Sequence, residues 1–489
     1  MSGFVEQTGC FGGLFRKARR TRYPTHDTAS TQKSGDISAV DTRVHHDEKC
    51  CYFNLTCDYS SCQESERWHL LEDPPSPTCS KAESDTEVPD QGILELVENT
   101  LNQLSPELRD ISMKIHANPE LMFEEKYAHD LLTDYISRQG FKVTKHYLGL
   151  ATAWRAEYQH GKGGRVVGIN SEMDALAGMG HACGHNLIAI SGVAVAIAVK
   201  ATMEACNIPG KVILLGTPAE ESGGGKVTLI KRGGYKEMDV CLMCHPAPGR
   251  PHSISVASTL AMQQIEVEFF GRTAHAGAAP WEGTNALDAA FIAYSSISVL
   301  RQQMKPDCRV HGIVLGRNWS ANVIPDYSKM IWIARAPTFA DLAPLVERVK
   351  NCLHASALAT SCKVDLNVGP AYYELNQNEV LGQAFVDILR DRYGMPQTNV
   401  ASSASTDFGN VTFEIPALHP VYAIPTEPQG GNHTPAFAKA AATLEAHRAT
   451  MTVSNGLALT ALRVLSDPLF FHQVKAAFSK SQLANNRVS

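Results

Sequence analysis

The chain has 489 residues, of which 44% are hydrophobic and 19% charged, so it has enough apolar surface for a folded core and is too long for one small domain. Its 44 Lys and Arg against 50 Asp and Glu give a formal charge of −6, which provides no basic field for nucleic acid. The longest nearly continuous apolar run, residues 187–199, is shorter than the roughly twenty residues that a bilayer-spanning helix needs. We expect a buried helix there, and no nucleic-acid or membrane partner.

Residues 1–91 are predicted to be a disordered N-terminal extension, because only ten of the first ninety are Ile, Leu, Val or Met. The extension has no apolar signal-peptide core, since glycines and Arg16 interrupt the short apolar patch at 11–15. The chain's thirteen cysteines, six of them in this extension, are therefore expected to be reduced thiols of a cytoplasmic protein. The cysteines at 50–62 lack the paired spacing of a structural zinc site. The basic stretch 16–22 has the charge of a mitochondrial presequence, but a solvated charge run is the simpler interpretation.

Residues 92–259 alternate between helical and strand patterns. Ser105 and Pro106 predict a helix start, and a second helix is expected at 126–139, where Gly140 ends it. Strands are then expected at 165–170, 211–216 and 239–244, separated by helices after His185 and at 226–232. Strands separated by helices are typical of an α/β fold with a mostly parallel sheet, in which ligands bind in the loops after the carboxyl ends of the strands.

Residues 260–372 follow a different order, strand–helix–strand–strand–helix–strand, which predicts an inserted α+β sandwich domain. Its elements are expected at 264–270, 285–303, 310–315, 328–334, 340–358 and 363–367. The sheet domain resumes over 373–475, with a helix at 379–393 and one long helix at 434–465. Residues 476–489 are expected to be a C-terminal tail.

Three loops after predicted strands, and the start of the last helix, carry side chains typical of metal ligands. Cys183 and His185 lie two apart where a turn enters a helix, and the helix N-terminus and a nearby cation would favour a thiolate. Of the adjacent Glu220 and Glu221, one can bind metal while the other holds a water as general base. His245 follows a strand and His433 opens the last helix. Each alone is more often a packing or surface residue; together they indicate a metal site.

Five stretches in order along the chain resemble motifs of metallopeptidase family twenty, the aminoacylase and carboxypeptidase type. They are residues 172–186, 216–225, 271–288, 322–326 and 405–411. The resemblance covers about residues 93–468 and is greatest to the amidohydrolase branch, in which a cysteine replaces the bridging aspartate of other members. Asn186 and Ile188, where many members of the branch have Asp and His, place the chain with a subset that resembles dipeptidases acting on β-alanyl-lysine and related basic dipeptides.

The resemblance implies a catalytic domain with helices on both faces of the sheet, and an inserted domain that serves as a lid and in dimerisation. It implies two divalent ions (zinc, manganese or cobalt), bridged by Cys183 and held by His185, Glu221, His245 and His433. Glu220 would be the general base and then the acid that protonates the leaving nitrogen, and Asp174 would orient the site.

In the inserted domain, the resemblance implies that His275 stabilises the oxyanion, often across a homodimer. Asn322 and Arg335 would bind the substrate carboxylate, for which a planar arginine fork is well suited. The predicted function is a binuclear metal-dependent amide hydrolase that cleaves small dipeptides or N-acyl amino acids with a free carboxylate. One alternative is an amidohydrolase for aromatic or fatty N-acyl amino acids, because nothing in the sequence resolves the acyl pocket. Another is a non-catalytic metal- or peptide-binding relative, whose expected signature is a lost ligand or base.

Overall fold

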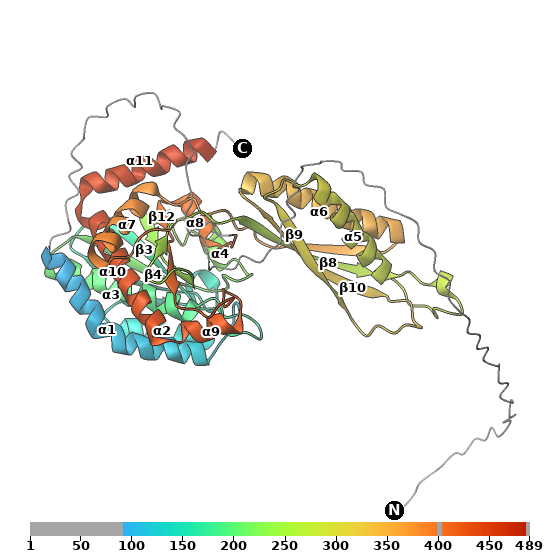
Figure 1. The fold of residues 1–489 in the computed structure, drawn as a ribbon, viewed down its shortest axis with the longest axis horizontal. Coiled ribbons are helices and arrows are strands. Elements are labelled where there is room, and N and C mark those ends of the chain that lie inside the picture. The colour runs from blue at the N-terminus through green and yellow to red at the C-terminus, as the bar shows by residue number, and fades with distance from the viewer. Residues whose placement is uncertain (1–90, 399–402, 486–489) are drawn as a thin grey trace, which may run out of the picture. The chain divides into compact units, whose positions relative to one another are not determined.

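The structure is a computed structural model that describes residues 91–398 and 403–485 (Figure 1). The predicted N-terminal extension, with its six cysteines and basic stretch, lies outside the described residues. The seven cysteines in the described part of the chain are all free.

A six-stranded sheet forms the centre of the sheet domain. Its strands in spatial order are β1 (Lys142–Lys145), β2 (Trp154–His160), β4 (Gly210–Thr217), β3 (Arg165–Glu172), β5 (Val240–Leu242) and β12 (Ala417–Leu418). The last four are parallel neighbours, whereas β1 and β2 add an antiparallel edge. The sheet is therefore mostly parallel, as predicted.

Helices cover both faces of this sheet because side chains alternate along its buried strands. On β4, Val212 and Leu214 pack in the core that includes α3 (His185–Ala205), whereas Ile213 and Leu215 pack with residues of α4 (Gly225–Lys231) and α8 (Phe408–Glu414). The α3 layer also contains α1 (Gln91–Ala117), α2 (Lys126–Arg138), α7 (Glu379–Tyr393) and α10 (Leu444–Ser466). Helix α3 is long and apolar enough to cross a membrane, but 89% of its most apolar stretch is buried inside the protein, as predicted for a core helix.

Three predicted elements have different limits in the structure. α1 begins at Gln91 and continues through Pro106, because one apolar stripe from Leu94 to Ile115 packs on the core along its whole length. The predicted long last helix is divided into α9 (Pro435–Ala441) and α10, since the Thr443 side chain accepts a hydrogen bond from the Ala446 N–H and starts a new helix.

The predicted tail is helical as far as the described residues extend. It belongs to α11 (Pro468–Asn485), which is held by the buried side chains of Phe470 and Val474. A small three-stranded sheet, β6 (His245–Pro248), β13 (Val421–Ile424) and β7 (Ile254–Ser255), extends from the end of β5.

The inserted domain has its own sheet and its own core. Its elements are β8 (Ala261–Phe270), α5 (Ala286–Leu300), β9 (Arg309–Gly316), β10 (Tyr327–Ala336), α6 (Phe339–Thr360) and β11 (Lys363–Val368), in the predicted order. The strands are antiparallel in the order β11-β8-β10-β9. Alternate residues of β10 are buried beneath α5 and α6, so one face of the sheet carries both helices (Figure 1). Strand β9 is the outer strand on one side.

Candidate metal centre

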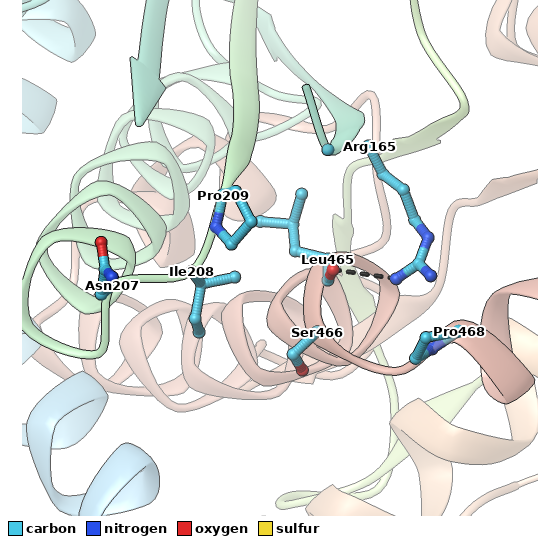
Figure 2. Close-up of a pocket in the computed structure, with 8 residues that line it drawn as sticks. Arg165, Asn207, Ile208, Pro209, Leu465, Ser466 and Pro468 are labelled. Carbon is cyan, nitrogen blue, oxygen red and sulfur yellow. Dashed lines mark hydrogen bonds between the residues drawn. The ribbon is translucent and has the colours of Figure 1, made fainter. Parts of the chain in front are cut away.

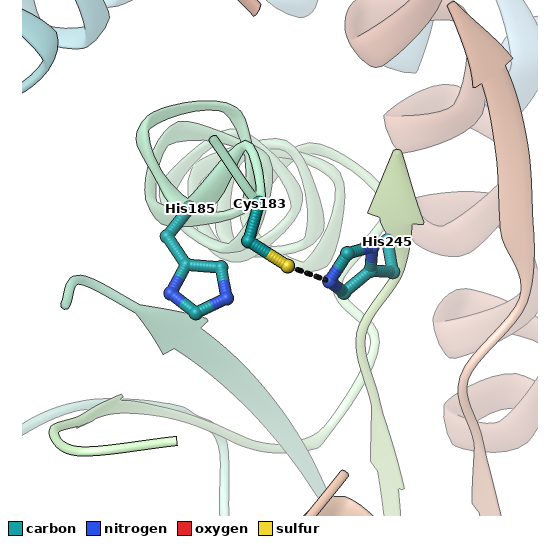
Figure 3. Close-up of side chains that lie close together, drawn as sticks. All are labelled: Cys183, His185 and His245. Atoms are coloured by element: carbon teal, nitrogen blue, oxygen red, sulfur yellow. Dashed lines mark hydrogen bonds between the residues drawn. The ribbon is translucent and has the colours of Figure 1, made fainter. Parts of the chain in front are cut away.

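Ligand-type side chains meet at the carboxyl edge of the central sheet, as predicted for an α/β fold. Two groups of three have their potential ligand atoms within 4.8 Å of one another, and the groups share Cys183. The first adds His185 and His245, and Cys183 Sγ lies 3.3 Å from His245 Nε2 (Figure 3). The second adds Glu221 and His433, whose Oε2 and Nε2 atoms are 3.4 Å apart. The structure thus brings all five expected ligands together.

Close packing of two loops places Cys183 beside His245. Gly184, between Cys183 and His185, caps α3 with φ +86°, and a Cβ there would lie 2.6 Å from Pro246 Cγ. Only glycine combines that backbone conformation with so close an approach. Position 184, between the two candidate ligands, therefore requires glycine.

Two non-glycine residues of the site have left-handed backbone conformations, which surrounding contacts must hold. Ala219, which precedes the glutamate pair, has φ 58°, and its N–H donates to the buried Glu125 carboxylate at 2.8 Å. His433 has φ 66°, and its N–H donates to the Ala182 carbonyl at 2.8 Å. These bonds fix the directions of Glu220 and His433.

Asp174 contacts both the His185 side chain and the backbone of Glu221. Its backbone oxygen lies 2.7 Å and its Oδ1 3.2 Å from His185 Nδ1, and its Oδ2 accepts the Glu221 N–H at 3.0 Å. This occupies Nδ1 of His185 and leaves Nε2 facing the site. Nε2 of His185 and Oε1 of Glu221 are buried without a hydrogen-bond partner, which is costly unless a cation binds there. The donor set, which comprises a thiol, imidazoles and a carboxylate, fits divalent transition-metal ions.

Burial dominates the electrostatics of the site. It raises the pKa of Glu221 to about 7. It also raises the pKa of the Cys183 thiol well above its usual range, and the negative charge of Glu221 raises that pKa further. A cation bound beside Cys183 would oppose this rise and favour the thiolate. Burial lowers the pKa of His245 to about 4, so the ring is neutral, as metal ligation requires.

A buried ion network behind the ligands was missed in the sequence analysis. Lys226 Nζ lies 2.7 Å from Glu172 Oε1 and 2.5 Å from Asp407 Oδ1, and all three side chains are fully buried. Glu172 Oε2 is 3.5 Å from His185 Nε2, and Glu172 forms a third ligand-type group with His185 and Glu220. The network therefore adjoins the metal centre.

The three predicted residues of the inserted domain fall into two groups. Arg335 Nη1 donates to Ser405 Oγ at 2.9 Å. Burial lowers the pKa of Arg335, and the charge of Glu220 opposes this effect. His275 and Asn322 lie together at the surface, where the Ala276 N–H donates to the Asn322 carbonyl. Within residues 91–398 and 403–485, no hydrogen bond or ion pair joins these two to the metal centre.

A cavity of about 420 Å³ lies at the opposite, amino end of β3 and β4 (Figure 2). Arg165 is the one charged side chain in its lining, and its Nη1 already donates to the carbonyls of Val464 and Leu465, each at 2.8 Å. None of the candidate metal ligands lines this cavity.

A mostly parallel α/β sheet with metal-type ligands at its carboxyl edge, a paired glutamate and an inserted α+β domain defines a metal-dependent hydrolase. Residues 168–452 match the profile of the peptidase family M20/M25/M40, and the chain belongs to this family. It is a metal-dependent amide hydrolase of the dipeptidase and amidohydrolase type, as the sequence predicted.

Three relatives of known name align with more than 60% of this chain. The chain is 40% identical over 395 residues to the Xaa-Arg dipeptidase of Mus musculus, covering 77% of this chain and 90% of the relative. It is 37% identical over 399 residues to the Homo sapiens Xaa-Arg dipeptidase, with the same coverage. It is 29% identical over 327 residues to one of the subunits of p-aminobenzoyl-glutamate hydrolase of Escherichia coli, covering 63% of this chain and 67% of the relative.

Solved structures of lower identity show the same fold. A dinuclear metal-binding peptidase of the M20 family from Bacillus subtilis aligns with a TM-score of 0.56 and 20% identity, over 74% of this chain and 99% of that one. An aminobenzoyl-glutamate utilization protein from Klebsiella pneumoniae aligns with a TM-score of 0.61 and 16% identity, over 76% and 99%.

Proposed function

We propose that the chain is a binuclear dipeptidase in which Cys183 bridges two divalent ions of zinc, manganese or cobalt. The observation that carries this proposal is that two ligand groups share one thiol, one completed by His185 and His245 and the other by Glu221 and His433. Ions held there would polarise the scissile carbonyl and lower the pKa of a coordinated water.

Glu220 is the proposed general base. Its side chain is buried, and Oε2 lies 3.8 Å from His185 Nε2, at the edge of the ligand cluster. Burial raises the pKa of Glu220 well above its usual range, and Glu172 and Glu221 add to the rise. A carboxylate of raised pKa is suited to accept a proton during attack and return it to the leaving nitrogen.

The surface residues of the inserted domain complete the proposed assignment. His275 Nδ1 accepts the N–H groups of Gly277 at 3.2 Å and Ala278 at 3.0 Å, so the neutral ring carries its proton on the exposed Nε2. That N–H can donate to an oxyanion. Asn322 and Arg335 are proposed to bind the substrate carboxylate.

Loss of the shared thiol should remove metal from both positions. We expect Cys183→Ala, after dialysis, to retain less than about a tenth of the metal affinity of the parent protein, since even changes behind a ligand cost 10- to 100-fold. Elemental analysis and metal titration measure this. Cys241→Ala is the matched control, because Cys241 is also buried and free but belongs to none of the ligand groups. Parental metal content in Cys183→Ala would contradict the bridging role.

The substrate class is proposed to be dipeptides with a C-terminal arginine or lysine. The support is the 40% and 37% identity to relatives named Xaa-Arg dipeptidase. We expect kcat/KM to be highest for such dipeptides in a panel that also contains p-aminobenzoyl-glutamate and fatty N-acyl amino acids. Faster cleavage of the aromatic or fatty acyl compounds would favour the alternative amidohydrolase. The 29% identical E. coli relative is named as a hydrolase of one such aromatic acyl compound, p-aminobenzoyl-glutamate.

A homodimer is proposed through the outer edge of the inserted sheet. On that side β9 exposes a run of apolar side chains, of which Ile313 is 54% exposed. Helix α5, which packs on β10 and β8 of the same sheet, exposes Phe291 at 63% and Val299 at 74%. An apolar edge strand readily pairs with a second copy of itself. Such pairing offers a route by which the surface-exposed His275 of one protomer could reach the metal centre of the other.

Sharing of the active site between protomers can be tested by complementation. Glu220→Gln and His275→Ala are each expected to be nearly inactive, but co-expression should restore about a quarter of the parental activity through mixed dimers with one intact site. Activity of separately purified variants and of the co-expressed pair measures this. If both residues act within one protomer, no mixed dimer has an intact site and the pair stays inactive.

A further inference from the structure

The two connections between the sheet domain and the inserted domain pair with each other. The outgoing chain passes through Met262 near the start of β8, and the returning chain passes through Tyr372 after β11. The Met262 N–H donates to the Tyr372 carbonyl at 2.9 Å, and the Tyr372 N–H donates to the Met262 carbonyl at 2.8 Å. These two residues therefore form a short antiparallel bridge where the domains join.

The Tyr372 side chain reaches from this bridge into the loop of the proposed base. It is 1% exposed, its hydroxyl donates to the Glu220 carbonyl at 2.7 Å, and the hydroxyl oxygen accepts the Gly224 N–H at 2.8 Å. One phenol thus ties both ends of the Glu220–Gly224 turn. The ring packs in a small cluster with Val227 and Met262.

The turn is shaped to approach the returning connection closely. Gly224 has φ +63°, and a Cβ on it would lie 2.5 Å from Pro370 Cγ. Neither the backbone conformation nor the space admits a larger residue without movement. The close contact between Gly224 and Pro370 of the returning connection therefore depends on glycine at position 224.

Three hydrogen bonds from outside the loop hold the backbone of residues 219–221, and they come from different parts of the described chain. Glu125 accepts the Ala219 N–H and Asp174 accepts the Glu221 N–H, and both of these carboxylates belong to the sheet domain. The third bond, to the carbonyl of Glu220 itself, comes from Tyr372. Of the three, only this bond comes from a connection to the inserted domain.

We propose that Tyr372 is a positioning residue for Glu220, which sets the placement of the base from the connection between the two domains. The proposal rests on the proposed role of Glu220. Without the hydroxyl, the Glu220 carbonyl and the Gly224 N–H lose their buried partner, and the turn relaxes to find others. A displacement of about 1 Å at a reacting group costs on the order of 100-fold in rate.

Tyr372→Phe tests this with a small change that keeps the ring in its cluster. We expect kcat to fall about 10- to 100-fold, with KM and metal content unchanged. Hydrogen exchange in residues 216–226 should become faster in both the metal-free and the metal-loaded protein, because the Gly224 N–H loses its acceptor. Tyr422→Phe is the matched control, since its hydroxyl is also buried and lies 2.7 Å from Thr450 Oγ1; it should leave kcat and exchange in 216–226 unchanged.

The possible outcomes separate this proposal from the assignment of the base. Parental kcat and parental exchange in Tyr372→Phe, with Glu220→Gln inactive, would overturn the positioning role and leave the base intact. Loss of metal from Tyr372→Phe would also overturn it, because the residue would then support the ligands and not the base. Full activity in Glu220→Gln would instead remove the proposed base, whatever Tyr372→Phe does.

Discussion

Glu220→Gln is expected to lower kcat for the best dipeptide by about 10²- to 10⁴-fold, the range that general acid–base catalysis contributes. Glutamine has the size of glutamate but cannot accept the proton, so substrate binding and the ligand cluster should be preserved. Steady-state kinetics with added Mn²⁺, Co²⁺ or Zn²⁺, together with elemental analysis, measure both properties on one sample.

The neighbouring glutamate provides the matched comparison. Glu221→Gln should also be inactive, but through loss of metal, since Glu221 belongs to one of the two ligand groups that share Cys183, whereas Glu220 belongs to neither of these two. Equal rates for the parent and Glu220→Gln would remove Glu220 as the base. A parent protein that is loaded with metal and inactive on the whole substrate panel would favour a non-catalytic relative.

Lys226→Met is expected to destabilise the protein by about 3–5 kcal/mol, the usual cost of breaking a buried ion pair on one side. Methionine fills similar space but leaves Glu172 and Asp407 buried without their counter-charge. Urea unfolding of the metal-free protein measures the change. Adding Asp407→Asn to the variant should recover part of the loss by removing one of the two uncompensated charges.

A second lysine pair shows the size of effect expected where water screens the charges. Lys329 lies 2.7 Å from Glu266, and both side chains are more than a quarter exposed. Lys329→Met should therefore cost no more than about 1 kcal/mol. Equal unfolding midpoints for the two variants would show that burial of the Lys226 network has no special weight.

The sequence predicted the fold class and the ligand cluster because both depend on local patterns. Short β-rich runs separated by helices place Cys183, Glu220 and His245 after successive strands, and parallel strands bring their carboxyl ends to one edge. The residue types at those ends then indicate a metal. No contact between distant parts of the chain is needed for either inference.

The sequence could not predict features that depend on tertiary packing. Pro106 is typical of a helix start, but the apolar stripe on both sides of it continues the helix. Lys226 follows three glycines at the start of α4, where a lysine would ordinarily be solvated, and its partner Asp407 is 181 residues away. Tyr372 is separated from Glu220 by the whole inserted domain. In each case the deciding partner is identified only by the folded chain.

The division of the sheet domain into two stretches of sequence affects the order in which the protein can mature during synthesis. The inserted domain's core residues lie in one continuous stretch, from Ala261 to Ala357, so they leave the ribosome together. The core of the sheet domain instead joins Leu94 to Val474, and His433 is the last candidate ligand to be translated. The inserted domain can therefore fold while its host is still incomplete, and loading of the full metal centre must wait until the last part of the chain has emerged.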